Sequence, residues 1–139
     1  MLIGSCLAGV AFMKGLGLVH SISHMIGAEY NTQHGLTNAI VLPSVMRFNL
    51  PHVGEKVRFI SEAMDLKEAS SDIIIKEIEK ILDYVDIPKS LSEIGIPLEC
   101  KRGIAEKAML DSATGTNPRG AQIEDVEKLT EISILFARA

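Results

Sequence analysis

The segment GLGLVHSISHMIGAEYNTQHG, Gly15 to Gly35, holds three of the four histidines in this chain of 139 residues. They are His20, His24 and His34. Imidazole is the commonest protein ligand for divalent transition metals, and it is the side chain best suited to proton transfer near neutral pH. The segment is therefore the first candidate for a functional site, and the rest of the chain is interpreted by how it would support that site.

A helix over Val19 to Ala28 would place His20 and His24 one turn apart on one face, with Cα atoms separated by about 6 Å along the axis. Two imidazoles at this spacing can converge on one metal ion. His34 follows a predicted break at Tyr30 to Gln33 and would open the next helix, so the chain could turn back and bring all three rings together. The glycines of the segment would let backbone or ligand approach closely. The competing interpretation is that the three are ordinary core or partly exposed histidines.

The composition favours a single domain made of packed helices. Hydrophobic residues make up 47% of the chain but aromatic residues only 4%, with no Trp, so Ile, Leu, Val, Ala and Met must fill the core. The net charge is −4 and no Lys/Arg cluster is present, which argues against nucleic acid or an anionic membrane as a partner. Cys6 and Cys100 show no spacing motif and predict reduced thiols in the cytoplasm.

Downstream of the histidine segment the hydrophobic periodicity is helical almost everywhere. Apolar stripes at helical spacing comprise Val53, Val57, Ile60 and Met64; Ile74, Ile78, Ile81 and Val85; Ile104, Ala108 and Met109; and Ile123, Val126, Leu129 and Ile132. Turn residues predict breaks at 49–51, 65–71, 86–89, 95–97 and 115–118. Pro43 predicts a kink, or a helix that ends near Leu42. The expected fold is an all-α, multi-helix bundle.

The first twelve residues, MLIGSCLAGVAF, carry no charge and are almost wholly apolar. They lack the basic flank of a signal peptide, and they are too short to cross a bilayer, which takes roughly 20 residues. A buried helix is the better interpretation. A chain that opens inside a buried helix, without a polar cap, suggests that a further segment precedes it.

The histidine segment and two later motifs resemble those of a known protein family. GLGLVHSISHMIGAEYNTQHGLTNAIVLPSVMRFN, Gly15 to Asn49, resembles the signature region of the iron-containing alcohol dehydrogenase family. LSEIGI at Leu91 to Ile96 and TNPR at Thr116 to Arg119 are similar to later landmarks of the same proteins. The resemblance implies that residues 1–139 form the all-helical C-terminal domain, related to dehydroquinate synthase. The N-terminal α/β domain, which binds NAD or NADP in that family, would be absent from this chain.

The resemblance also implies roles for the three histidines. His20 and His34 match two metal ligands of the family, whereas His24 matches a residue that lies near the nicotinamide and the substrate and is assigned to proton relay. The other two ligands, an aspartate and a histidine, would lie upstream of this chain. The implied reaction is hydride transfer between a small alcohol or aldehyde and the nicotinamide, at Fe(II) or alternatively Zn(II). Because it would hold only two of the four metal ligands, the isolated chain is expected to be inactive. It is also expected to self-associate through the apolar face that the missing domain would leave exposed.

Two other hypotheses remain open from the sequence. The chain could be a free-standing helical interaction or metal-binding module without dehydrogenase activity. It could also be a separate metal protein in which His20, His24 and His34 are all ligands.

Overall fold

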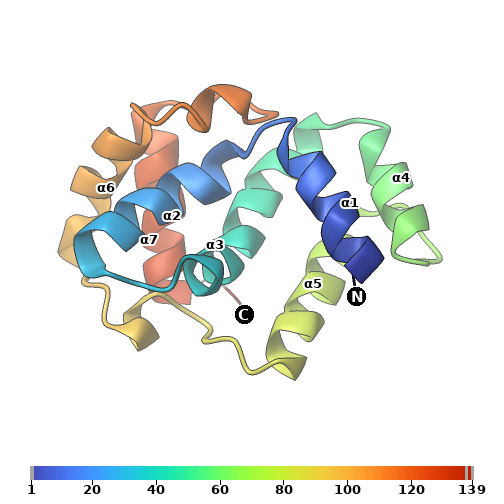
Figure 1. Cartoon of the computed structure of the whole chain (residues 1–139), viewed down its shortest axis with the longest axis horizontal. Coiled ribbons are helices and arrows are strands. Elements are labelled where there is room, and N and C mark those ends of the chain that lie inside the picture. Colours follow the sequence, from blue (N-terminus) through green and yellow to red (C-terminus); the bar gives the residue numbers. More distant parts are fainter. Residues whose placement is uncertain (1, 137, 139) are drawn as a thin grey trace.

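A computed structural model describes residues 2–136 and residue 138 of the chain. The described residues form α-helices joined by loops and short 3₁₀ turns, and they contain no strand (Figure 1). The helices are α1 (Leu2–Phe12), α2 (Gly17–Tyr30), α3 (His34–Asn49), α4 (Lys56–Ala63), α5 (Ser71–Tyr84), α6 (Lys101–Ala108) and α7 (Ile123–Phe136). The predicted all-α class is confirmed, and the predicted breaks fall between helices.

Four helices, α2, α3, α6 and α7, pack around the main core. Its fully buried side chains include Leu18, Ile22, Ile26, Ile40, Val41, Leu91, Ile104, Val126 and Ile134. Each such aliphatic side chain contributes about 1.5–3 kcal/mol when it leaves water. The core therefore fixes α2 and α3, the two helices that carry the histidines.

A smaller cluster joins α4 and α5 to the end of α3. Its buried members are Leu50, Ile74 and Ile75, and the stripe predicted over 53–64 packs against them. The stripe predicted on α5 is wrong in part, because Ile81 and Val85 are more than half exposed. Packing against α3 and α4 turns α5 so that Ile75 and Leu82 face inward instead.

Pro43 does not end its helix. Helix α3 runs from His34 through Asn49 with Pro43 inside it and buried. Proline removes one backbone hydrogen bond, but the neighbouring Val41 and Val45 are almost completely buried. Tertiary packing on both sides of the proline therefore holds the helix together. Of the two predicted outcomes, a kink or an end near Leu42, the end is wrong.

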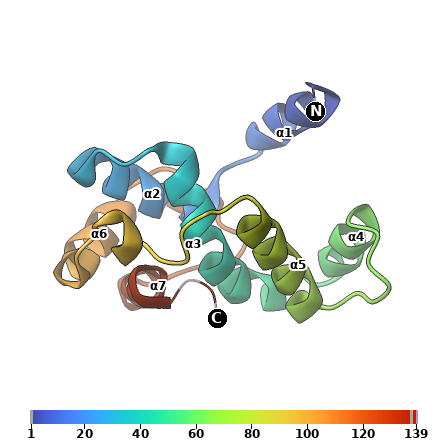
Figure 2. The ribbon, with the colours of Figure 1, turned by 90° about the horizontal axis from the view of Figure 1, so that it is seen from below.

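Helix α1 corrects the expectation of a buried N-terminal helix. The segment is helical from Leu2, but none of its residues is buried, and the helix stands away from the bundle (Figure 2). Leu2 is 89% exposed and Phe12 is 53% exposed. Most of its apolar surface is therefore exposed, although the ring of Phe12 at its end meets the ring of His20.

No single helix in the described part of the chain has both the length and the apolar character needed to cross a membrane. Helices α1 and α2 together are long and apolar enough, but they are bent by 94° at their junction.

Candidate functional site

The N-terminus of α2 is capped by residues that lie about a hundred positions further along the chain. The Thr116 hydroxyl oxygen accepts hydrogen bonds from the backbone N–H groups of Leu16 and Gly17, at 3.1 and 3.2 Å. The Asn117 side-chain oxygen accepts from the N–H of Leu18 at 3.2 Å. The first turn of a helix leaves its N–H groups without intrahelical partners, so these bonds satisfy donors that local residues leave open.

Two glycines are required by this close approach. Gly15 has φ +125°, and a Cβ at this position would lie 2.5 Å from the Thr116 Cβ. Gly17 has φ +66°, and its Cβ would lie 2.9 Å from the Asn117 side-chain oxygen. The expectation that glycines in this segment permit a close backbone approach is confirmed here, and the approaching group is the TNPR segment.

Asn117 also ties α2 to the end of α3. Its side chain and that of Asn49 form a reciprocal amide pair, with N···O distances of 2.8 and 2.9 Å. The Asn117 amide donates in addition to the Arg119 carbonyl at 2.7 Å. One side chain thus joins the start of α2, the end of α3 and the loop before α7.

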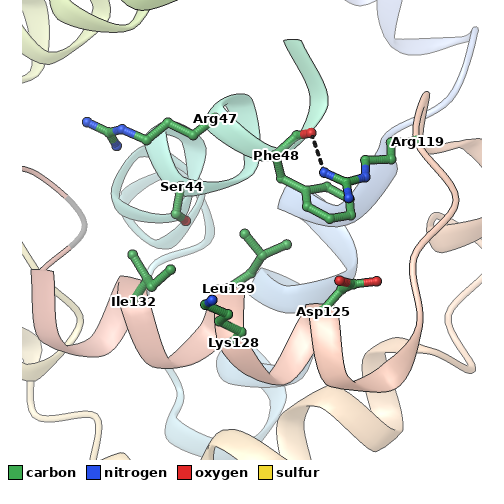
Figure 3. A pocket seen from close by; sticks show the side chains of 8 residues that line it. All are labelled: Ser44, Arg47, Phe48, Arg119, Asp125, Lys128, Leu129 and Ile132. Atoms are coloured by element: carbon green, nitrogen blue, oxygen red, sulfur yellow. Dashed lines mark hydrogen bonds between the residues drawn. The ribbon is translucent and has the colours of Figure 1, made fainter. Parts of the chain in front are cut away.

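Arg119 completes the TNPR segment and anchors it against α3. Its guanidinium lies over the Phe48 ring, 3.8 Å from the ring centroid, and donates to the Phe48 carbonyl oxygen at 3.2 Å (Figure 3). Both residues line a pocket of about 340 Å³ between α3 and α7, which also includes Ser44, Arg47, Asp125, Lys128, Leu129 and Ile132. The histidines do not line this pocket.

The three predicted histidines come together as expected. The ring centroids of His20 and His34 lie 5.3 Å apart, those of His24 and His34 lie 5.3 Å apart, and those of His20 and His24 lie 5.8 Å apart. His20 and His24 share a face of α2, and His34 is the first residue of α3. Asn31, in a left-handed conformation with φ 52°, ends α2 and lets the chain reverse between the two helices.

Asn38 connects two of these imidazoles. Its side-chain nitrogen lies 3.3 Å from Nε2 of His20 and 3.0 Å from Nε2 of His34. The Asn38 oxygen in turn accepts a hydrogen bond from the Ser23 hydroxyl. An amide N–H₂ group can only donate, so both Nε2 atoms present lone pairs toward the same point.

The surroundings of His20 favour its neutral form. Burial lowers its pKa below the ordinary value, and the nearby imidazole of His34 lowers it further. The Phe12 ring meets the His20 ring edge-on. The neutral imidazole, with a free lone pair, is the species that ligates metals.

His24 has a different partner. Its Nδ1 lies 2.9 Å from Oδ2 of Asp111, whose other oxygen accepts from the Ala113 N–H at 2.7 Å. Burial acts to raise the pKa of Asp111, but the hydrogen bonds from Ala113 and His24 outweigh it and the pKa lies below the ordinary value. The two side chains line a cavity of about 270 Å³, together with Gly15, Leu16 and Thr116.

Sequence reasoning therefore found the histidines but missed Asn38 and Asp111. Asn38 is four residues after His34 on the same helix, a spacing that brings side chains together. Asp111 follows His24 by 87 residues, and no local pattern connects them. Within the part of the chain that the structure describes, no three His, Cys, Asp or Glu side chains are arranged to hold a metal ion by themselves.

The chain is similar in sequence to proteins of one known family. Residues 1–134 match the model of the Fe-containing alcohol dehydrogenase family, C-terminal. The chain is 40% identical over 136 residues to lactaldehyde reductase of Escherichia coli, covering 93% of this chain and 36% of that protein. It is 35% identical over 130 residues to the NAD-dependent methanol dehydrogenase of Bacillus methanolicus, covering 88% of this chain and 34% of that protein.

Solved structures show the same fold. The crystal structure of a 1,3-propanediol oxidoreductase superposes with a TM-score of 0.81 at 28% identity, covering 86% of this chain and 33% of that one. An alcohol dehydrogenase from Oenococcus oeni gives a TM-score of 0.80 at 28% identity, covering 85% and 32%. The chain spans about a third of the length of the relatives that it matches. It belongs to the Fe-containing alcohol dehydrogenase family, whose C-terminal part it represents.

Proposed function

We propose that this chain is the metal-binding helical domain of an NAD(P)-dependent, iron-type alcohol dehydrogenase that interconverts a small alcohol and its aldehyde or ketone. The observation that carries the proposal is the convergence of two imidazole Nε2 atoms, from His20 and His34, on the single amide nitrogen of Asn38. Family membership supplies the reaction class, and the local geometry supports the division of roles among the histidines.

The donor set fits a divalent transition metal. Fe(II) is the first choice because of the family, and Zn(II) is the alternative because imidazole and carboxylate ligands accept both. His20 and His34 would bind the ion through Nε2, and Asn38 would have to withdraw its N–H₂ group from between them. A bound metal would act as a Lewis acid that polarises the substrate oxygen and lowers the pKa of the alcohol.

His24 would serve proton transfer and contact the nicotinamide, not the metal. Its partner is the Asp111 carboxylate, whereas the Asn38 amide contacts only His20 and His34 among the three histidines. In alcohol oxidation the carbon gives a hydride to the nicotinamide and the hydroxyl gives a proton to a base. The His24 imidazole, which lines the cavity beside Asp111, is the base we assign.

The remaining parts of the enzyme would come from an N-terminal domain. We infer that this domain binds NAD or NADP, supplies an aspartate and a histidine as the other metal ligands, and packs near α1. The coverage of about a third of each relative supports this division. With only two ligands of its own, the chain alone would be inactive. Its two free cysteines agree with a reducing, cytoplasmic location.

The first experiment titrates the purified chain with Zn(II), and anaerobically with Fe(II), in a calorimeter. Weak binding that His20→Ala or His34→Ala abolishes is expected, with His24→Ala unchanged. Tight stoichiometric binding that requires His24 would instead support a three-histidine metal protein.

The second experiment replaces the matching C-terminal part of E. coli lactaldehyde reductase with residues 1–139 and measures metal content and turnover. The chimera should bind metal and reduce aldehydes with a nicotinamide cofactor. His20→Ala and His34→Ala should lose metal and activity together, whereas His24→Ala should keep metal and lose turnover. A chimera that folds and binds cofactor but takes up no metal would refute the proposal and favour a module without dehydrogenase activity.

A further inference from the structure

We infer that Asp111 is a positioning residue for His24, which fixes the imidazole as the tautomer with hydrogen on Nδ1 and a lone pair on Nε2. The structural part of this inference concerns the chain alone. Its catalytic consequence rests on the function proposed above, because Nε2 is the atom whose lone pair would take the proton from the substrate.

The contact is direct and well supported. His24 Nδ1 lies 2.9 Å from Asp111 Oδ2, and an ionised carboxylate has no hydrogen to give, so the ring nitrogen must be the donor. The Asp111 side chain is only 14% exposed, and its second oxygen is held at 2.7 Å by the Ala113 N–H. Neither oxygen is thus free to turn away from His24 without breaking a bond.

The loop that carries Asp111 is itself tied to α2. Thr116 caps the start of α2, and the Thr114 hydroxyl donates to the Ala108 carbonyl at 2.6 Å, which closes the loop after α6. Residues 111–117 therefore contact α2 at its first turn and again at His24. A carboxylate on such an anchored loop can orient an imidazole, whereas one on a free loop would follow it.

The stacked rings explain why His24 needs a fixed orientation. Its ring lies over that of His34 with an interplanar angle of 17° and a centroid distance of 5.3 Å. A half-turn of the His24 ring about χ2 would exchange Nδ1 with Cδ2, and Nε2 with Cε1, without changing the plane of the ring. The bond to Asp111 selects one of these two states, in the same way that a carboxylate orients the histidine of a catalytic triad.

The test begins with the chain itself, labelled with ¹⁵N-histidine, at a pH where the imidazoles are neutral. Two-dimensional NMR of the ring nitrogens should show His24 protonated on Nδ1. Asp111→Ala should shift His24 to the Nε2–H form or to a mixture. Asp111→Asn has one acceptor oxygen for two donors, the Ala113 N–H and the His24 Nδ1–H, so it should give a mixture of the two tautomers. Glu106→Ala is the control, because it removes an exposed carboxylate of α6 that pairs with Arg102. An unchanged His24 tautomer in folded Asp111→Ala would overturn the inference.

The chimera supplies the functional arm. Asp111→Ala should lower kcat by about 10- to 100-fold, with metal content and KM close to the parent, and Asp111→Asn should recover part of the loss. Loss of metal in Asp111→Ala would mean that Asp111 supports the metal site and not His24, and would overturn the inference. An inactive parent chimera together with the expected NMR result would refute the proposed function while leaving the positioning role in place.

Discussion

Asn117→Ala tests whether the TNPR segment is the clamp that holds the two histidine helices. The substitution removes hydrogen bonds to four partners: the Leu18 N–H, the two polar atoms of the Asn49 amide, and the Arg119 carbonyl. Asn49 is 9% exposed, so water cannot readily replace the lost partner. The α2 terminus and the α3 terminus would both lose their connection to the loop.

The magnitude follows from the number of bonds and their burial. A net contribution of about 0.5–1.5 kcal/mol for each of the four hydrogen bonds gives a loss of about 2–6 kcal/mol in the free energy of unfolding. Small domains have a total stability of about 5–15 kcal/mol, so the loss is a large fraction. A decrease of roughly 10 °C in Tm is expected for a chain of this length.

Urea unfolding followed by far-UV circular dichroism measures the loss. Asn117→Asp is the matched variant, because it keeps an acceptor for the Leu18 N–H but sets a carboxylate oxygen, which cannot donate, against the Asn49 and Arg119 oxygens. It should therefore also be destabilised, through loss of the two donor bonds alone. Each of these hydrogen bonds is expected to contribute about 1 kcal/mol. A total loss in Asn117→Ala below about 1 kcal/mol would therefore refute the proposed role of the TNPR segment as a clamp.

Three further predictions concern other parts of the chain. Gly17→Ala should destabilise by at least about 1–2 kcal/mol because of its positive φ, whereas Gly103→Ala, in open space within α6, should stabilise by about 0.5–1 kcal/mol in the same unfolding assay. Burial raises the pKa of the Cys100 thiol, so mass spectrometry should show exposed Cys6 alkylated first and Cys100 only as the pH rises above the usual cysteine range. Sedimentation should show self-association that Leu7→Glu, at a 64% exposed position of α1, reduces; a clean monomer in the unaltered chain would contradict this.

The sequence predicted those features that depend on local chemistry. Hydrophobic spacing is a direct consequence of helical geometry, so the all-α class and the breaks between helices were predictable. The histidine segment was equally local, because helical spacing places His20 and His24 on one face and Asn31 ends α2 before His34. The prediction of convergent rings needed only a short connection between two helices.

Features that depend on distant segments were decided by the tertiary structure. Which face of α5 is buried, and whether α3 continues past Pro43, depend on the helices packed against them, since burial can outweigh local preference. Exposure of α1 likewise reflects which surfaces lie beside it, because an apolar helix carries no information about its own partner.

The candidate site shows the same division. Imidazole chemistry marked the histidines in the sequence, but Asp111 reaches His24 and Asn117 reaches the start of α2 only because the chain folds back across about a hundred residues. A hydrogen bond depends on distance and direction in space, and separation along the chain specifies neither. The sequence by itself thus determined which groups can bind a metal or move a proton, and the packing of α2 against the 111–117 loop decided which of them meet.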